Sequence, residues 1–311
     1  MELLGNGSFF IEQLMNAIML GCIYTLVAVG FSLFFGVLDV VVFCSGDIAV
    51  FGTFSLMGAY MIFETAGLIG SLPTPVWFML LLGVSAILCA GLGVFTYVSS
   101  IRPFEKSSSL MPLLSTIALG FVIREMIGLF FPLGRNPQRF PRLIPNGSFG
   151  GHALLSYRNV AIIAVTFFVL LAVFLFLKKS KMGNAMQAVA QNKKLAAISG
   201  MNIRSVAITT FVLGGVLLSV AGFLIGAYYG TVRFDNGSLY GIKGFSAAVV
   251  GGLSNIYGAI IGGMLLAFIE VFVAILPGGA AYASAVAFVV VVFFMVVKPE
   301  GILGEKTIEK V

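Results

Sequence analysis

A few charged side chains fall inside the long apolar segments of this chain, and they are the first candidates for chemistry. Asp47, Glu125 and Glu270 supply carboxylates, and Arg124 directly precedes Glu125. Carboxylates within a membrane could carry protons or sodium ions, which leaves an ion-coupled secondary transporter open. An unpaired charge at that depth costs about 2.5–3.5 kcal/mol. We therefore expect Arg124 and Glu125 each to face the bundle interior or water and to pair with another helix, because neighbouring helical residues point about 100° apart. We expect Glu270 to lie at a subunit interface.

Side chains for covalent or nucleotide chemistry are scarce. His152 is the only histidine and falls in a polar loop, and no G-x-S-x-G motif occurs in an apolar segment. An intramembrane serine protease, which needs a serine paired with a base, is therefore a remote alternative. The chain has no G-x-x-x-x-G-K-[ST] motif to cradle ATP. Its cysteines, Cys22, Cys44 and Cys89, form no C-x-x-C pair. We predict no enzyme, no metal site and no directly bound cofactor.

The composition places these residues in a membrane protein. Of the 311 residues, 59% are hydrophobic and 10% are charged, and the mean hydropathy is +1.09, whereas soluble domains carry about 25% charged residues. A helix needs roughly 20 apolar residues to cross the bilayer. We predict one all-α transmembrane domain over 1–311 with eight or nine crossings, of which 240–253 is short enough to be broken or re-entrant. The predicted spans are 10–36, 48–63, 76–98, 110–131, 159–177, 205–229, 240–253, 257–276 and 280–297.

Basic residues in two loops predict the orientation. The loop 178–204 contains six Lys and Arg residues, and the loop 132–158 contains four. One predicted span separates them, so they lie on opposite sides, and the positive-inside rule assigns the richer loop to the cytoplasm. The N-terminus then lies outside and the C-terminus in the cytoplasm, with 132–158 as an arginine-rich external loop.

The cytoplasmic loop has the residues of a surface helix. Asn184 is a plausible N-cap, 185–199 is rich in helix formers, and Gly200 is a natural stop. A helix of this length is too short and too polar to span, so we expect it along the inner surface. It could rest on anionic lipid, or it could dock a cytoplasmic partner against its small side chains.

Two glycine-interrupted regions, 36–58 and 235–263, are the candidates for a translocation path. Irregular backbone at membrane depth is tolerated where it lines a cavity. The alternative is close helix packing, which we favour for the G-x-x-x-G spacings of Gly222, Gly226 and Gly230 and of Gly258 and Gly262. The residues we expect to line or gate the path are Ser45, Gly46, Asp47, Ser55, Gly244 and Ser246.

Four stretches in order carry a family resemblance: QLMNAIMLGCIYTLVAVG at 13–30, the segment 182–230 beginning MGNAMQAVAQNKKLAAISG, GIKGFSAAVVGGLSNIYGAIIGG at 241–263, and KPEGILG at 298–304. Together they resemble the bacterial branched-chain amino acid ABC transporter permease family, and most closely its H-type inner-membrane subunit. The resemblance implies a permease subunit that moves branched-chain amino acids or related small polar solutes by alternating access. Its implied partners are two cytoplasmic ATP-binding subunits that use the ATP, an M-type permease or a second copy of the chain, an extracytoplasmic binding protein and the lipid bilayer, with no nucleic acid.

The resemblance also assigns roles to residues. It makes the 178–204 loop the element that meets the ATPase. The positive charge of the external loop suits docking of the implied binding protein through Arg135, Arg139 and Arg142. The alternative is a solvated loop with no partner. Ser45 stands where the family usually has His before Gly46 and Asp47, so the substrate could be leucine, another amino acid, urea or a short amide. The residues expected at the ATPase contact are Asn184, Ala188, Gln191, Lys194, Ala196, Ala197 and Gly200.

Overall fold

The computed structural model describes residues 7–67, 74–105, 107–108, 110–132, 134–141, 143–144, 147–148 and 156–304, and this part of the chain is mostly α-helical. Seven of its helices are long and apolar enough to cross a membrane, which confirms the predicted class. Two apolar helices, α9 (Gly237–Gly251) and α11 (Ala283–Val297), have 15 residues each. The seven long helices are α1 (Gly7–Leu38), α2 (Ser45–Thr65), α3 (Thr74–Thr96), α4 (Leu110–Phe130), α5 (Tyr157–Lys179), α8 (Ile203–Tyr229) and α10 (Ile256–Ile275).

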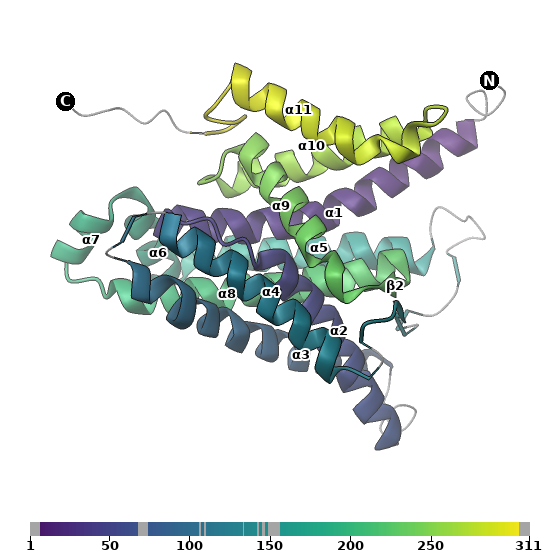
Figure 1. The fold of residues 1–311 in the computed structure, drawn as a ribbon, viewed down its shortest axis with the longest axis horizontal. Helices are drawn as coiled ribbons and strands as arrows, with labels where there is room; N and C mark the ends of the chain where they lie inside the picture. The colour runs from purple at the N-terminus through teal and green to yellow at the C-terminus, as the bar shows by residue number, and fades with distance from the viewer. Residues whose placement is uncertain are drawn as a thin grey trace.

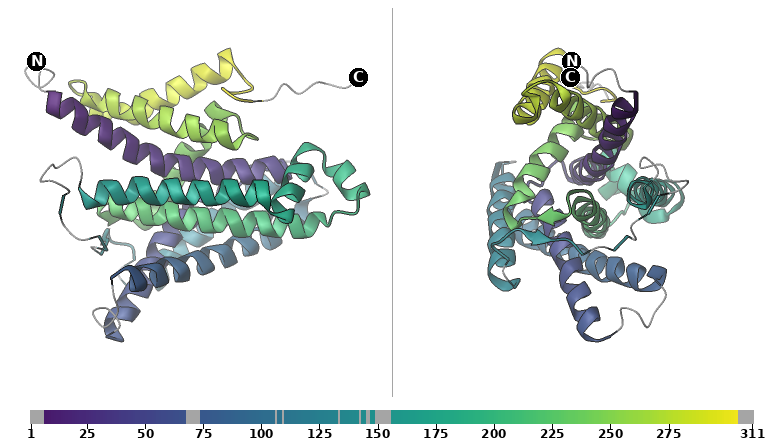
Figure 2. Two further views of the ribbon diagram at one scale, coloured as in Figure 1. Left: turned by 180° about the vertical axis from the view of Figure 1, so that it is seen from behind. Right: turned by 90° about the vertical axis from the view of Figure 1, so that its right-hand side faces the viewer.

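The helices run between two ends of the molecule (Figure 1). The start of α1 lies at one end, together with a two-stranded antiparallel ribbon of β1 (Gln138–Arg139) and β2 (Thr231–Val232). The short helices α6 and α7 and the end of α11 lie at the other end (Figures 1 and 2). The loops 132–158 and 178–204 therefore belong to opposite ends, as the sequence predicts.

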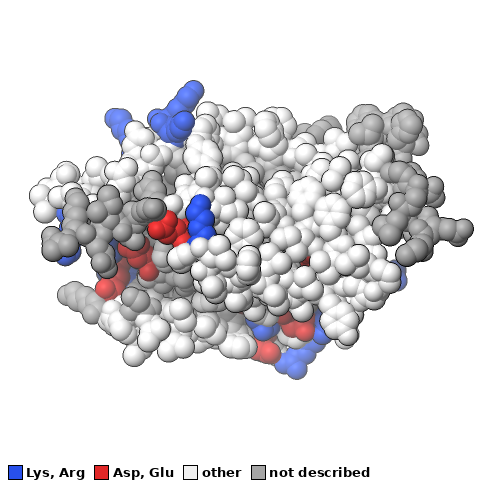
Figure 3. Space-filling view, turned by 90° about the horizontal axis from the view of Figure 1, so that it is seen from above, with Lys and Arg blue, Asp and Glu red and all other residues white. Residues whose placement is uncertain are grey.

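Burial separates the inner helices from the outer ones. The apolar window of α1 is 89% buried and that of α8 is 72% buried, whereas those of α3 and α5 are each 22% buried. Helices that are apolar on every side, such as α1, suit the centre of a bundle. The face shown in Figure 3 carries its charged side chains mainly near its ends and margins, which suits a surface that faces lipid.

The chain is unwound between α1 and α2, inside the first glycine-interrupted region. Asp39 has a positive φ of 53°, which is uncommon for a residue other than glycine. The Phe43 N–H donates to Thr116 Oγ1 of α4 (3.4 Å), and the Ser45 hydroxyl donates to the Val42 carbonyl (2.5 Å). Side chains thus satisfy some of the polar groups that unwound backbone would leave unpaired in a membrane.

The KPEGILG segment closes the end of α9. The N–H groups of Ile302 and Leu303 donate to the carbonyls of Val250 (2.8 Å) and Gly251 (3.0 Å). The Asn255 amide donates to the Leu303 carbonyl (2.9 Å) while its oxygen caps the start of α10. Since the last carbonyls of a helix have no partner within it, the segment supplies the donors that α9 lacks.

The predicted helix from 185 to 199 with Asn184 as its N-cap is wrong. The loop forms two helices, α6 (Lys181–Gln191) and α7 (Lys193–Ile198). The Ser180 hydroxyl caps α6, and the Asn192 side chain accepts from the N–H groups that open α7, which divides the segment. The expected stop at Gly200 is confirmed, with φ +81° and its N–H bonded to the Ala197 carbonyl (3.1 Å).

Candidate functional site

The first charged pair joins α2 to α4. Arg124 Nη2 donates to Asp47 Oδ1 (3.0 Å) and Oδ2 (3.3 Å), and the two side chains are 17% and 5% exposed. The expectation that Arg124 pairs with another helix is confirmed. Its neighbour Glu125 instead points outward and pairs with Arg135 (3.1 Å), both side chains being more than half exposed.

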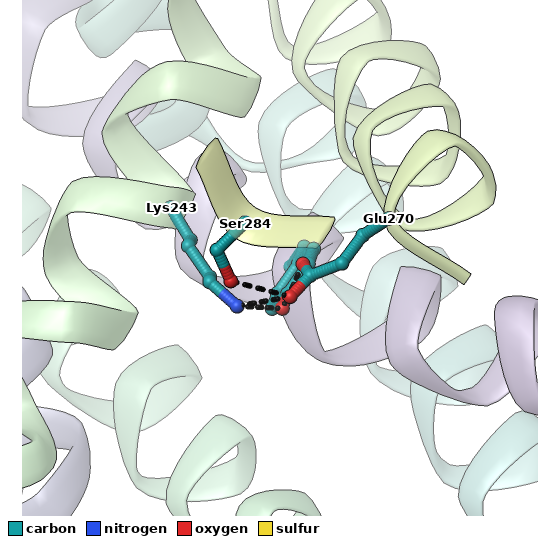
Figure 4. Close-up of polar contacts among 4 residues, drawn as sticks. Lys243, Glu270 and Ser284 are labelled. Carbon is teal, nitrogen blue, oxygen red and sulfur yellow. Dashed lines mark hydrogen bonds and ion pairs between the residues drawn. The ribbon is translucent and has the colours of Figure 1, made fainter. Parts of the chain in front are cut away.

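The second charged group joins four helices and is shown in Figure 4. Lys243 Nζ of α9 pairs with Glu270 Oε1 of α10 and donates to Tyr24 Oη of α1 (2.9 Å). Tyr24 donates to Glu270 Oε2 (2.7 Å), and Ser284 of α11 donates to Glu270 Oε1 (2.9 Å). Glu270 thus has its partners within its own chain, and its expected place at a subunit interface stays a prediction. Lys243 and Glu270 are the only charges between 240 and 276, a signal from which the pair could have been inferred.

Glycines fill the space between these two groups, where α2 meets α9. The Gly46 backbone lies directly against Gly237 and Gly241, and a side chain at Gly46 or Gly237 would collide with backbone or with Asp47. Gly244 packs in the same way against Val27 of α1. Only residues without a Cβ allow so close an approach.

The six expected path residues are packed against neighbouring helices in the observed conformation, but they do not all lie at one place. Ser45 and Asp47 are buried beside the start of α9, and Ser246 is buried on α9 itself. Ser55 lies further along α2, where its hydroxyl bonds to Ser85 of α3 (3.0 Å). Any opening at this place requires α2 and α9 to separate.

The G-x-x-x-G glycines serve mainly in packing, as the sequence favours. Gly222 lies against Ala49, and Gly226 lies against the Phe140 ring. Gly230 differs, because it ends α8 with φ +68° and has no neighbour that a side chain would meet. Gly258 and Gly262 lie against the α9 backbone, at Gly251 and Ala247.

The arginines of the outer loop do not form one patch. Arg135 is paired with Glu125, whereas Arg139 lines a cavity of about 610 Å³ together with Arg158. Arg142 and His152 lie outside the described residues.

The opposite end presents an exposed surface on α6 and α7. Ala196, at 4% exposed, faces inward, while Ala188 is half-buried. The sequence-based prediction missed Leu195 and Ile198, which are 60% and 82% exposed on α7. These two residues could have been found from the sequence, because large apolar side chains are unusual in a loop that is otherwise polar. The other expected contact residues are exposed: Asn184, Gln191, Lys194, Ala197 and Gly200.

Comparison with known proteins places these features in a family. Residues 13–295 match the family described as the permease component of the branched-chain amino acid transport system. The chain belongs to this family. The permease is 31% identical to the high-affinity branched-chain amino acid transport system permease protein BraD of Pseudomonas aeruginosa, over 97% of this chain and 98% of that protein. It is also 31% identical to the Escherichia coli permease protein LivH, with the same coverage. No solved structure matches it.

The permease is thus an integral membrane subunit of an ABC importer and acts with other components of such a system. A probable LivH permease of Methanocaldococcus jannaschii is 26% identical over 68% of the chain. Within the permease, the Lys243 group and the glycine contact involve α9, the pair of Asp47 and Arg124 joins α2 to α4, and the loop at 178–204 projects at one end (Figure 1).

Proposed function

We propose that this permease carries branched-chain amino acids across a bacterial inner membrane by alternating access, driven by two separate ATP-binding subunits. The observation that carries the proposal is the 31% identity, over nearly the whole chain, to two proteins named as branched-chain amino acid permeases. Other amino acids, urea and short amides are the alternative substrates. The Ser45 hydroxyl bonds to the Val42 carbonyl, so substrate recognition through this side chain would require that bond to break.

In this proposal the cytoplasmic subunits push on α6 and α7. The exposed side chains of Leu195 and Ile198 offer apolar anchors beside Ala197, which leaves room for a close contact. Lys194 adds charge at the rim. Interfaces of this kind combine buried apolar anchors with a polar margin. Ala196 faces inward, so we leave it out of the direct contact.

The gate in this proposal lies where α2 meets α9. The contact at Gly46 is made by backbone atoms of the two helices, which lets α9 slide or withdraw past this residue. The pair of Asp47 with Arg124 and the pair of Lys243 with Glu270 hold the two sides of the gate. An ion-coupled transporter is less well supported, because both buried carboxylates are already neutralised by basic partners.

The outer end in this proposal receives the binding protein. Arg135 and Arg139 are exposed there, and Arg142 belongs to the same loop. Acidic groups on a binding protein would be attracted to them. We further propose that the permease pairs with an M-type subunit or with a second copy of itself, with its N-terminus outside and its C-terminus in the cytoplasm.

The decisive experiment measures uptake and ATP hydrolysis in reconstituted vesicles that contain the permease and the products of neighbouring genes. We expect a binding protein loaded with leucine to stimulate hydrolysis and uptake. Ala197→Glu should leave basal hydrolysis and abolish the stimulation, because it places a charge in the proposed contact. Uptake that follows a proton or sodium gradient without any ATPase would contradict the proposal.

Lys181→Gln provides the matched control. It changes the net charge by the same amount as Ala197→Glu, and Lys181 is exposed at the start of α6, away from α7. Stimulation should survive this change. Equal loss in both variants would mean that charge in the loop matters, and not contact through α7.

A further inference from the structure

The cavity at the outer end is lined by both apolar and cationic residues. Phe140, Leu143 and Phe223 are among its apolar residues, and Arg139 and Arg158 also line it. Its volume of about 610 Å³ lies within the range of roughly 300–1,000 Å³ that is usual for small-molecule sites. No acidic residue is among the described residues that line it.

Both arginines are available to a ligand. Within the described part of the chain, neither Arg139 nor Arg158 has an ion-pair partner, unlike Arg124, Arg135 and Arg233. A guanidinium group binds a carboxylate through two parallel hydrogen bonds. A carboxylate in the cavity would therefore meet two positive charges that no carboxylate of the described chain neutralises.

Two helix ends of opposite polarity meet at the same cavity. The start of α5 contributes Ser156 and Arg158, and the last turn of α8 contributes Ala227 and Tyr229. The N-terminus of a helix favours negative charge, and the C-terminus favours positive charge. The cavity thus offers a place for an anion and a place for a cation, as an amino acid zwitterion requires.

We propose that the outer cavity is a binding site for a zwitterionic, apolar amino acid, which it receives before the gate opens. The site deepens the proposed function and rests on it. Arg139 and Arg158 hold the α-carboxylate, the C-terminal end of α8 faces the ammonium group, and Phe140 and Phe223 take the apolar side chain. Tyr229 also packs on Tyr240 of α9, with ring centroids 5.9 Å apart, so the site adjoins the helix that carries Lys243.

A thiol-protection assay on the assembled transporter tests this site. Thr231→Cys introduces an exposed reporter into the cavity, while the native cysteines are all buried. We expect leucine to slow its modification by a membrane-impermeant thiol reagent several-fold, and leucinol, which lacks the carboxylate, to have little effect. Ser156→Cys gives a second reporter from the α5 side. Arg139→Gln combined with Arg158→Gln should remove the protection.

Arg233→Gln is the control for the loss of an arginine at this end, since Arg233 pairs with Asp235 and does not line the cavity. It should leave the protection unchanged. Equal protection by leucine and leucinol, or none by leucine, would overturn the proposal. Protection by the ligand-free binding protein alone would assign the cavity to docking instead. Uptake by the unmodified transporter is measured separately, so a failure of the site is distinguishable from a failure of the proposed function.

Discussion

The pair of Lys243 and Glu270 is stable in a buried place because every strong polar group has a partner. Tyr24 and Ser284 donate hydrogen bonds to the carboxylate, and the ammonium group bonds to both Glu270 and Tyr24. Removing one partner leaves a buried charge without compensation, whereas removing both charges can be nearly neutral. Four helices meet at this group, so its loss should be felt throughout the bundle.

A double-mutant cycle tests this interpretation. We expect Lys243→Met and Glu270→Gln each to lower the stability of the purified transporter, and the double variant to be more stable than the sum of the single effects implies. Coupling energies for residues in contact are about 0.5–3 kcal/mol. Thermal unfolding in detergent measures the effect. The exposed pair of Arg233 and Asp235 is the control and should show less coupling. Additive effects at Lys243 and Glu270 would contradict the network.

Contact between α2 and α9 depends on the absence of side chains at Gly46 and Gly237. Gly46→Ala would drive a methyl group into the α9 backbone, which cannot yield as a flexible side chain can. We expect loss of folded, assembled protein, measured as the monodisperse fraction in size-exclusion chromatography. Gly91→Ala in α3 is the matched control, because nothing lies within 4 Å of the added atom, and it should be tolerated. Tolerance of both changes would show that α2 and α9 are not held together there.

At the level of elements, the long apolar segments are the part of the fold that could be predicted from the sequence. The segments 110–131 and 205–229 correspond closely to α4 and α8, because uninterrupted apolar runs define their limits. The break between α6 and α7 was not predictable from propensity, since it depends on the Asn192 side chain competing for backbone N–H groups. Likewise, a partner for Arg124 was predictable, but its identity as Asp47 depends on how α2 and α4 pack.

Across the whole molecule, basic residues gather at the end that carries α6 and α7. In the described residues, Lys and Arg lie there at positions 102, 178, 179, 181, 193, 194, 204 and 298, and at the opposite end at 135, 139, 158 and 233. The side of a membrane protein richer in Lys and Arg normally faces the cytoplasm. The asymmetry therefore agrees with an interior position for α7 and an exterior position for the β1–β2 ribbon.

Single cysteines at the two ends test that orientation. Ser199 and Asn136 are both exposed, and the native cysteines are buried, so added thiols dominate the labelling. We expect an impermeant thiol reagent to label Asn136→Cys in cells whose outer membrane is permeabilised and whose inner membrane is intact. The same reagent should label Ser199→Cys only in inverted vesicles. The reverse pattern would place α7 outside. The ATPase contact and the outer amino acid site would then exchange sides, and because ATP is supplied from the cytoplasm, both proposals would fail together.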